Sequence, residues 1–176
     1  MTTLSLLLAR VPRISLIACA LALLAGCASA VPTPVAPVSF TVPRMLHVQR
    51  AHPALPDGDA FLVVQAEAGH TRWSLFTVLG APLARQTLED GHWRNDGFAP
   101  PNASATRLFA ALVFAWTPEA DLAERYRQDR YTVDTGRRTL SQKNGKPLIV
   151  ADSKEQLSVE LPDGSTWVLR PLEQVQ

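Results

Sequence analysis

Few residues of this sequence are placed to do covalent or metal chemistry. The histidines are His47, His52, His70 and His92. His47 and His52 are five residues apart near an expected strand, which puts them on opposite faces and makes them a poor metal pair. His70 and His92 lie beside expected turns. We interpret all four as exposed or packed turn residues and predict no metal site.

The acidic residues follow the same pattern. The aspartates are mostly typical of turns, where the side chain bonds to its own backbone; they include Asp57, Asp59, Asp90, Asp96 and Asp163. The sequence has no Gly-rich phosphate loop, no G-x-S-x-G elbow and no H-E-x-x-H helix. We predict no enzyme and no cofactor. A periplasmic enzyme remains the third alternative, and it requires His and Asp side chains that converge in a cleft.

Cys27 is the residue with the clearest chemical role. Arg10 and Arg13 precede an uncharged, mostly apolar run, residues 14–25. The sequence Leu24-Ala25-Gly26-Cys27 overlaps the end of this run. A run of about a dozen residues is short of the roughly 20 that span a bilayer, and the order of charge, apolar core and small residues is typical of an export signal. The pattern predicts a lipoprotein signal peptide over residues 1–26, with Cys27 acylated after cleavage.

The predicted anchor sets the expected location. The residue after the cysteine is Ala28 rather than Asp, which by analogy with the enterobacterial sorting rule indicates the outer membrane. The other cysteine, Cys19, leaves with the signal peptide, so the mature chain is expected to have no disulfide. We expect a lipid-anchored protein on the periplasmic face of the outer membrane.

The aromatic and large apolar residues form the candidate binding site. Many such side chains simply fill a core, and we keep that alternative open. The other interpretation is an apolar cavity between a sheet and a helix. Its candidate lining is Trp73, Phe76, Phe109, Leu112, Val113 and Trp116.

Charge excludes one class of partner. The chain has 17 basic and 16 acidic residues, and loss of Arg10 and Arg13 leaves a mature net charge of −1. A protein so close to neutral lacks the basic surface that nucleic acid requires. We expect a monomer that contacts the membrane through its lipid, with a periplasmic carrier or an export complex as possible partners.

Turn signals define the elements around the candidate site. Asp90-Gly91, Asn144-Gly145 and Asp163-Gly164 each lie between alternating apolar segments. Asx-Gly pairs favour type I′ hairpin turns, because both central residues then need positive φ. Trp73, Leu75, Thr77 and Leu79 are expected on one strand face, and the continuous apolar run at residues 61–64 indicates a strand covered on both sides. The body is therefore predicted to be antiparallel β.

A helix interrupts the strands. After two prolines, residues 102–116 are apolar on nearly every side, with Asn102 or Ser104 as the N-cap. Such a helix is expected to be buried. A short helix should follow through Tyr126, with Thr117 as its cap and Pro118 at its first position.

Together these elements predict an α+β fold. We expect a curved antiparallel sheet, an incompletely closed half-barrel, with the apolar helix and the short helix on its concave side. The predicted organisation is a signal peptide at 1–26, an acylated cysteine with a Pro-rich tether at 27–44, and one domain at 45–176. The tether is expected to lift this domain off the membrane.

Two parts of the sequence resemble a known family. They are the segment from Trp73 to Trp93, with its Leu79-Gly80 and Asp90-Gly91 pairs, and Trp116-Thr117-Pro118 after the apolar helix. Over roughly residues 45–172 the chain resembles a family of bacterial lipoproteins often associated with aryl-polyene or polyketide pigment genes. That family is remotely similar to LolB, the outer-membrane lipoprotein receptor. The resemblance implies an open half-barrel, LolA/LolB-like, that holds acyl chains. LolB also has a protruding loop with an exposed apolar residue, for which the sequence alone indicates no counterpart.

Three functions follow in order of preference. The first is a carrier or receptor that binds or transfers a hydrophobic, acylated or lipid-like cargo. The second is a non-catalytic scaffold or assembly lipoprotein with a filled core, which an exposed apolar patch outside any cavity would favour. The third is the enzyme described above.

Overall fold

The computed structural model describes residues 32–35, 40–42, 44–97, 99 and 101–172. The signal peptide predicted for residues 1–26 and the predicted acylation site Cys27 lie outside these residues. The chain divides into two units, Met1–Ala30 and Val31–Gln176, and the second contains everything described below. Among the described residues, no helix is both long and apolar enough to cross a membrane.

The second unit has an α+β fold in which two helices interrupt a series of strands. Its elements, in chain order, are β1 (Arg44–His52), β2 (Leu55–Glu67), β3 (His70–Thr77), β4 (Pro82–Glu89), β5 (His92–Asn95), α2 (Ala103–Trp116), α3 (Glu119–Arg125), β6 (Arg130–Asp134), β7 (Arg137–Ser141), β8 (Pro147–Asp152), β9 (Leu157–Glu160) and β10 (Thr166–Pro171). The strands before the helices and those after them form two series of hairpins. The predicted antiparallel strands and the two predicted helices are confirmed.

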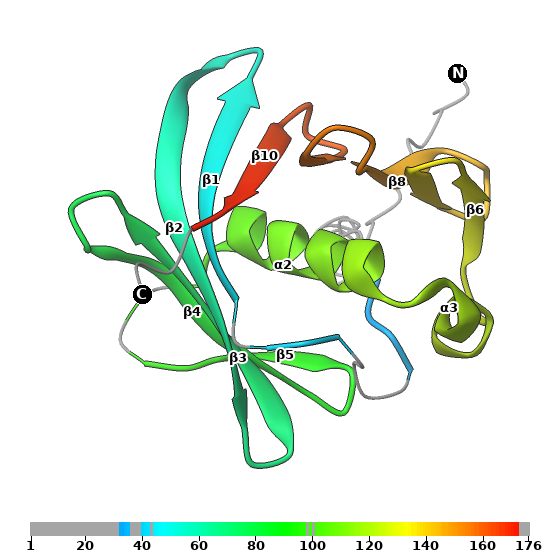
Figure 1. Cartoon of the computed structure of the whole chain (residues 1–176), viewed down its shortest axis with the longest axis horizontal. Coiled ribbons are helices and arrows are strands. Elements are labelled where there is room, and N and C mark those ends of the chain that lie inside the picture. Colours follow the sequence, from blue (N-terminus) through cyan, green and yellow to red (C-terminus); the bar gives the residue numbers. More distant parts are fainter. Residues whose placement is uncertain (1–31, 36–39, 43, 98, 100, 173–176) are drawn as a thin grey trace, which may run out of the picture. The chain divides into compact units, whose positions relative to one another are not determined.

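All ten strands belong to one open antiparallel sheet, in the order β5-β4-β3-β2-β1-β10-β9-β8-β7-β6. The first and last strands of the chain pair at its centre, with Val48 opposite Leu169. Helix α2 contacts β4 near one edge and β8 and β9 near the other, and the strands lie around it in Figure 1. In a flat sheet β4 and β8 would be roughly 29 Å apart, which exceeds the roughly 21 Å length of a 14-residue helix. The sheet therefore bends around α2.

The face of the sheet toward α2 forms the core. On β2, Leu62 and Val64 are fully buried, whereas Phe61 and Val63, which alternate with them, are half-buried. Successive strand residues point to opposite faces, so the even-numbered residues face the helix. The prediction that residues 61–64 are covered on both sides is wrong for the outer face, which is only partly covered.

The hairpin turns use two geometries. At Asp90-Gly91 both residues have positive φ, 49° and 75°, as the prediction requires for type I′. At Gly145 and Gly164 the glycine alone is positive, and its N–H donates to the carbonyl three residues earlier. This is a type I turn followed by a left-handed glycine. The hairpins were predicted correctly, but the turn type was wrong at these two sites.

The helix boundaries follow from side-chain caps. Asn102 is the N-cap of α2, and its side-chain oxygen accepts from the Ala105 N–H at 3.1 Å. Thr117 does not cap α3 as predicted, because its hydroxyl donates at 2.7 Å to the Val113 carbonyl at the end of α2. Pro118 instead occupies the N-cap position of α3. The hydrogen bond from Thr117 to Val113 therefore fixes the turn between the two helices at the end of α2.

We expect Asn102→Ala to lower the free energy of unfolding by about 1 kcal/mol, because the Ala105 N–H loses its acceptor. Asn102→Ser, which keeps a capping oxygen, should cost only a few tenths of that amount. Urea unfolding of both variants measures the difference. Equal stability of the two variants would show that the cap does not stabilise α2.

Candidate functional site

An aromatic cluster lies between β3 and α2. The Trp73 ring is 5.5 Å from Phe109 and 5.7 Å from Trp116, centroid to centroid, and it stacks on the latter. Trp93 from β5 contacts Trp73 edge-on at 5.6 Å. Aromatic rings in this distance range attract one another beyond the burial of their area. The cluster therefore joins the sheet to the C-terminal half of the helix.

The remaining candidate cavity residues divide into two groups. Leu112 and Val113 are fully buried in the same core as Trp73. Phe76 is not brought into this cluster. It pairs with Phe61 across β2 and β3, on the face opposite Trp73, and it is half-buried there. The candidate residues on the helix side thus form packed core around the cluster, with Trp116 half-buried at its rim.

A segment before β1 covers one end of the cluster. We call the described residues 32–35 and 40–42 the strap. The Phe40 ring contacts Trp73 at 5.9 Å and Trp116 at 5.3 Å, both edge-on, and the Val35 N–H donates to the Arg125 carbonyl at 3.0 Å. Part of the segment that the sequence predicted as tether therefore packs on the domain.

Arg44, the first residue of β1, holds the strap from the other side. Its guanidinium carbon lies 4.4 Å from the Trp116 ring centre and 5.8 Å from that of Phe40, and its Nε donates to the Thr41 carbonyl. Burial lowers the pKa of Arg44 below its ordinary value, but an arginine stays charged at neutral pH. The cation therefore stabilises both rings in their contact.

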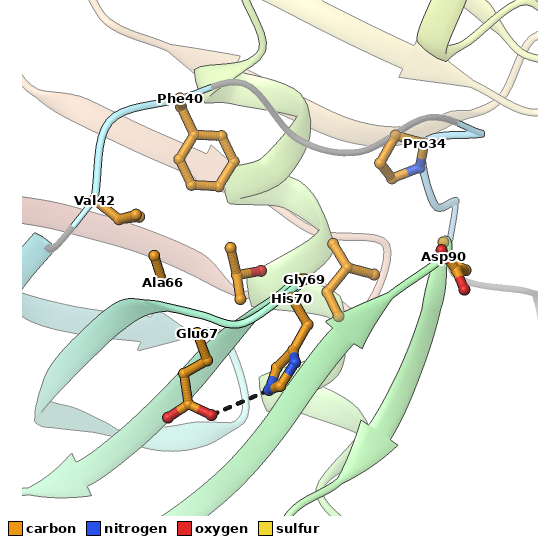
Figure 2. A pocket seen from close by; sticks show the side chains of 11 residues that line it. Pro34, Phe40, Val42, Ala66, Glu67, Gly69, His70 and Asp90 are labelled. Atoms are coloured by element: carbon orange, nitrogen blue, oxygen red, sulfur yellow. Dashed lines mark hydrogen bonds and ion pairs between the residues drawn. The ribbon is translucent and has the colours of Figure 1, made fainter.

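A cavity of about 300 Å³ lies under the strap, and we call it the strap pocket. Phe40 and Val42 line it from the strap, and Ala66, Thr71 and Leu88 line it from the sheet. Figure 2 shows the strap passing over it, with Phe40 and Pro34 on one side and the β2–β3 hairpin on the other. Its volume is at the lower end of the range for small-molecule sites.

Polar groups stand at the rim of this pocket. His70 Nε2 lies 3.1 Å from the Glu67 carboxylate, as drawn in Figure 2. Arg72 also pairs with Glu67, and its Nε donates to Asp96 at 2.6 Å. These charges are paired with one another and join the two hairpins, and Thr71 and Asp90 add further polar groups to the lining of the pocket.

The histidines are not brought together among the described residues. They contain no group of three or more His, Cys, Asp or Glu that could hold a metal ion. His47 pairs with Asp59 at 2.9 Å on the outer face, while His52 contacts the Asp163 carbonyl at a turn. Burial raises the pKa of Tyr126 behind α2 and that of Asp129 nearby, and neither residue lines the strap pocket.

The β3–β4 turn presents an apolar tip that the sequence pattern misplaced. Leu79 is 94% exposed and Val78 is 53% exposed. Alternation predicted Leu79 on the face of Trp73 and Leu75, and this prediction is wrong. The strand ends at Thr77, and Gly80 turns the chain with φ of 83°. The Leu-Gly pair was the available signal that Leu79 belongs to a turn.

The sequence interpretation also missed Phe40 and Val42, because it treated the Pro-rich segment as one tether. Their alternating positions just before β1 were the only signal that they pack on the sheet. No protein-family model matches this chain, and comparison with curated proteins finds no match. Inference about function therefore depends on the chain's own residues.

We expect Gly91→Ala to loosen the strap. A Cβ at Gly91 would lie 2.8 Å from the Pro34 carbonyl oxygen, and its φ of 75° adds backbone strain of about 1 kcal/mol. The Val35 amide, whose hydrogen bond holds the strap, should then exchange with deuterium about tenfold faster or more. Hydrogen exchange followed by NMR measures this rate.

Gly69→Ala is the matched control. Its φ of 82° imposes similar strain, but a Cβ there meets nothing within 4 Å. This variant should lose stability and keep slow exchange at Val35. Equal acceleration in both variants would show that general destabilisation, and not contact with Pro34, releases the strap.

Proposed function

We propose that this chain is a lipoprotein, anchored through acylated Cys27 on the periplasmic face of the outer membrane, whose domain binds or transfers a hydrophobic, acylated cargo. The observation that carries the proposal is the strap pocket, a partly apolar hollow with Glu67, His70 and Asp90 in its lining, covered by a segment that lies outside the sheet. Binding in it requires no covalent chemistry. The site needs only an affinity for acyl chains close to that of the membrane.

The fold supports this proposal. A bent, open antiparallel sheet with an apolar helix against its inner face is the arrangement that the LolA/LolB-like half-barrel resemblance implies. In such a sheet each edge strand, β5 and β6, is paired on one side only. The sheet is therefore not closed by hydrogen bonds and can open. A cargo-binding half-barrel needs this freedom, because a fully closed core would have to unfold to admit an acyl chain.

The strap explains how a packed core could admit a ligand. Phe40 occupies the rim of the aromatic cluster, but among the described residues the strap makes a single backbone hydrogen bond to the domain, from Val35 to Arg125. Segments with few such bonds open at low free-energy cost. An acyl chain that replaces the Phe40 ring would contact Trp73 and Trp116 without any change in the sheet.

The exposed turn supports a membrane role. Leu79 and Val78 are exposed in the β3–β4 turn, and LolB, to which the resembled family is remotely similar, has an exposed apolar residue in a protruding loop. A leucine that is 94% exposed gives up no packing when it enters a lipid interface. Its burial there is favourable by roughly 1.5–3 kcal/mol.

A scaffold lipoprotein is the second candidate. Leu55 and Met45 are also about half exposed, and neither lines the strap pocket. Exposed apolar side chains outside a cavity are typical of protein–protein contacts. This function predicts no uptake of cargo, so the experiment on the strap pocket separates it from the carrier.

The carrier proposal predicts that Ala66→Trp blocks uptake. Ala66 is exposed and lines the strap pocket, so an indole there fills the hollow without disturbing the core. Native mass spectrometry of the unit Val31–Gln176, incubated with a single-chain fatty acid or a lipopeptide, measures uptake. We expect near-stoichiometric binding by the parent unit and about tenfold less by the variant.

Ala68→Trp provides the control, because Ala68 is exposed in the same hairpin but does not line the pocket. It should bind as the parent does. A parent protein that takes up no acyl ligand would exclude the carrier and favour the scaffold. Equal uptake by both variants would show that the acyl ligand binds elsewhere in the domain and not in the strap pocket.

The proposed membrane contact predicts that Leu79→Glu weakens binding to vesicles of phosphatidylethanolamine and phosphatidylglycerol by about tenfold, since the lost burial exceeds 1.4 kcal/mol. Stability should change by less than about 0.5 kcal/mol, because Leu79 is exposed. Val133→Glu, at a 38% exposed residue of β6, is the control. Sedimentation with vesicles compares them, and identical binding would remove the β3–β4 turn from the membrane contact.

A further inference from the structure

A second hollow lies at the other end of α2. It has a volume of about 220 Å³ and is lined by apolar side chains, with Leu75 and Leu83 from β3 and β4 and the Trp167 ring from β10. Its polar lining includes Arg50 and Ser104. We call it the arginine pocket. It differs from the strap pocket in that a cation belongs to its wall.

Arg50 faces the interior of the bent sheet. It has the parity of the buried residues Leu46 and Val48 on β1, and it pairs with Trp167. Its guanidinium carbon lies 5.8 Å from the centre of that indole. Desolvation of an arginine on an otherwise apolar face costs free energy unless an anion or a set of hydrogen-bond acceptors compensates its charge.

The protein supplies little of that compensation. Arg50 donates from Nη2 to the Pro56 carbonyl at 3.2 Å, and its Nε is buried without a hydrogen-bond partner. No ion pair within 4 Å joins it to a carboxylate among the described residues. Asp59 also borders the hollow, but its carboxylate bonds to His47 and Gln49.

The nearest other charges are already paired. Arg107 lies 3.6 Å from Asp163. Burial would raise the pKa of Asp163, but hydrogen bonds from Ser165 and the charge of Arg107 lower it overall. Asp163 therefore stays ionised and engaged at its own turn, and it forms no ion pair with Arg50.

The start of α2 adds to the positive potential. Ser104 is in the first helical turn, which contains no acidic residue, and its side chain borders the same hollow as Arg50. The N-terminal end of a helix favours negative charge. The arginine pocket thus combines a cation and a helix start with apolar walls.

We propose that the arginine pocket binds the anionic head of a single-chain amphiphile, a carboxylate or phosphate on an acyl chain, whose first methylenes lie against Leu75, Leu83 and Trp167. This inference rests on the proposed function and narrows its cargo. A charge-assisted bond from the guanidinium supplies the preference for an anion. The apolar walls supply the preference for a chain.

Isothermal titration of the unit Val31–Gln176 tests the proposal with decanoate, decyl phosphate, decan-1-ol and acetate. This unit is compact and contains the whole described core. We expect decanoate or decyl phosphate to bind at least about tenfold more tightly than decanol, and the better of the two names the head group. Acetate should bind far more weakly, since it has no chain.

Arg50→Met should remove the preference for the anion and leave decanol binding unchanged. Arg170→Met is the matched control, because Arg170 is exposed on the outer face opposite His47 and its loss changes the net charge equally. Thermal unfolding checks that both variants fold. Equal affinities of the two variants for decanoate would overturn the proposal.

Ser104→Glu gives a test that does not depend on loss of an inward side chain. A carboxylate in the first turn favours the helix and places an anion beside Arg50, so this variant should be as stable as the parent and bind decanoate about tenfold less. Equal binding of decanoate and decanol by the parent would overturn the anion site and leave the carrier intact. Binding of neither would overturn both.

Discussion

The middle of helix α2 is buried on every side, and the rest of the domain is arranged around this constraint. Seven consecutive residues, from Leu108 to Phe114, are no more than 1% exposed. One face of a sheet can cover only about half of a helix, so a flat sheet would leave apolar surface in water. The bend that brings β4, β8 and β9 to one helix is therefore required by the composition of the helix itself. Near the C-terminal end of α2, Tyr126, the C-cap of α3, packs edge-on against Phe114.

The buried helix also determines where hollows can remain. Its middle, from Leu108 to Phe114, is fully buried in the core, so side chains fill the space between this part of the helix and the sheet. The two hollows lie instead near its ends. The strap pocket adjoins the aromatic cluster around Trp116, and the arginine pocket includes Ser104 in the first turn.

Local signals predicted most of the architecture. The Asx-Gly pairs placed the hairpins, because glycine and the turn demand the same positive φ, and Asn102 placed the start of α2 because its cap is made within three residues. The order of strands in the sheet had no comparable local signal. Pairing of β1 with β10 joins residues more than 100 positions apart, such as Val48 and Leu169, and only the shared burial of the helix brings them together.

The candidate site was predicted less completely, for a related reason. Trp73, Phe109 and Trp116 are all aromatic residues of strong periodic elements, and the structure brings them into one cluster. Phe76 was assigned by residue type, but strand parity puts it on the outer face. Phe40 belongs to a segment whose prolines suggested an extended chain. Its role depends on where that chain passes, which composition does not specify. Arg50 was likewise not predicted as a site residue. Its inward position is recognised only once the inner and outer faces of β1 are known.

The strap links the proposed anchor to the proposed site through chain length. With the strap bound, the chain between Cys27 and Pro34 can span at most roughly 25 Å, so the strap pocket is held near the membrane surface. Leu79 lies at the opposite end of β3, whose eight residues extend roughly 26 Å. Under the proposed anchoring, the β3–β4 turn can reach the same membrane with the strands along its surface, or with the chain between Cys27 and Pro34 extended and the strands upright. Release of the strap as far as Arg44 lengthens the free chain to a maximum of roughly 60 Å. The domain can then contact the lipid through Leu79 in more orientations, so displacement of Phe40 by a cargo would change both the pocket and the range of orientations of the domain.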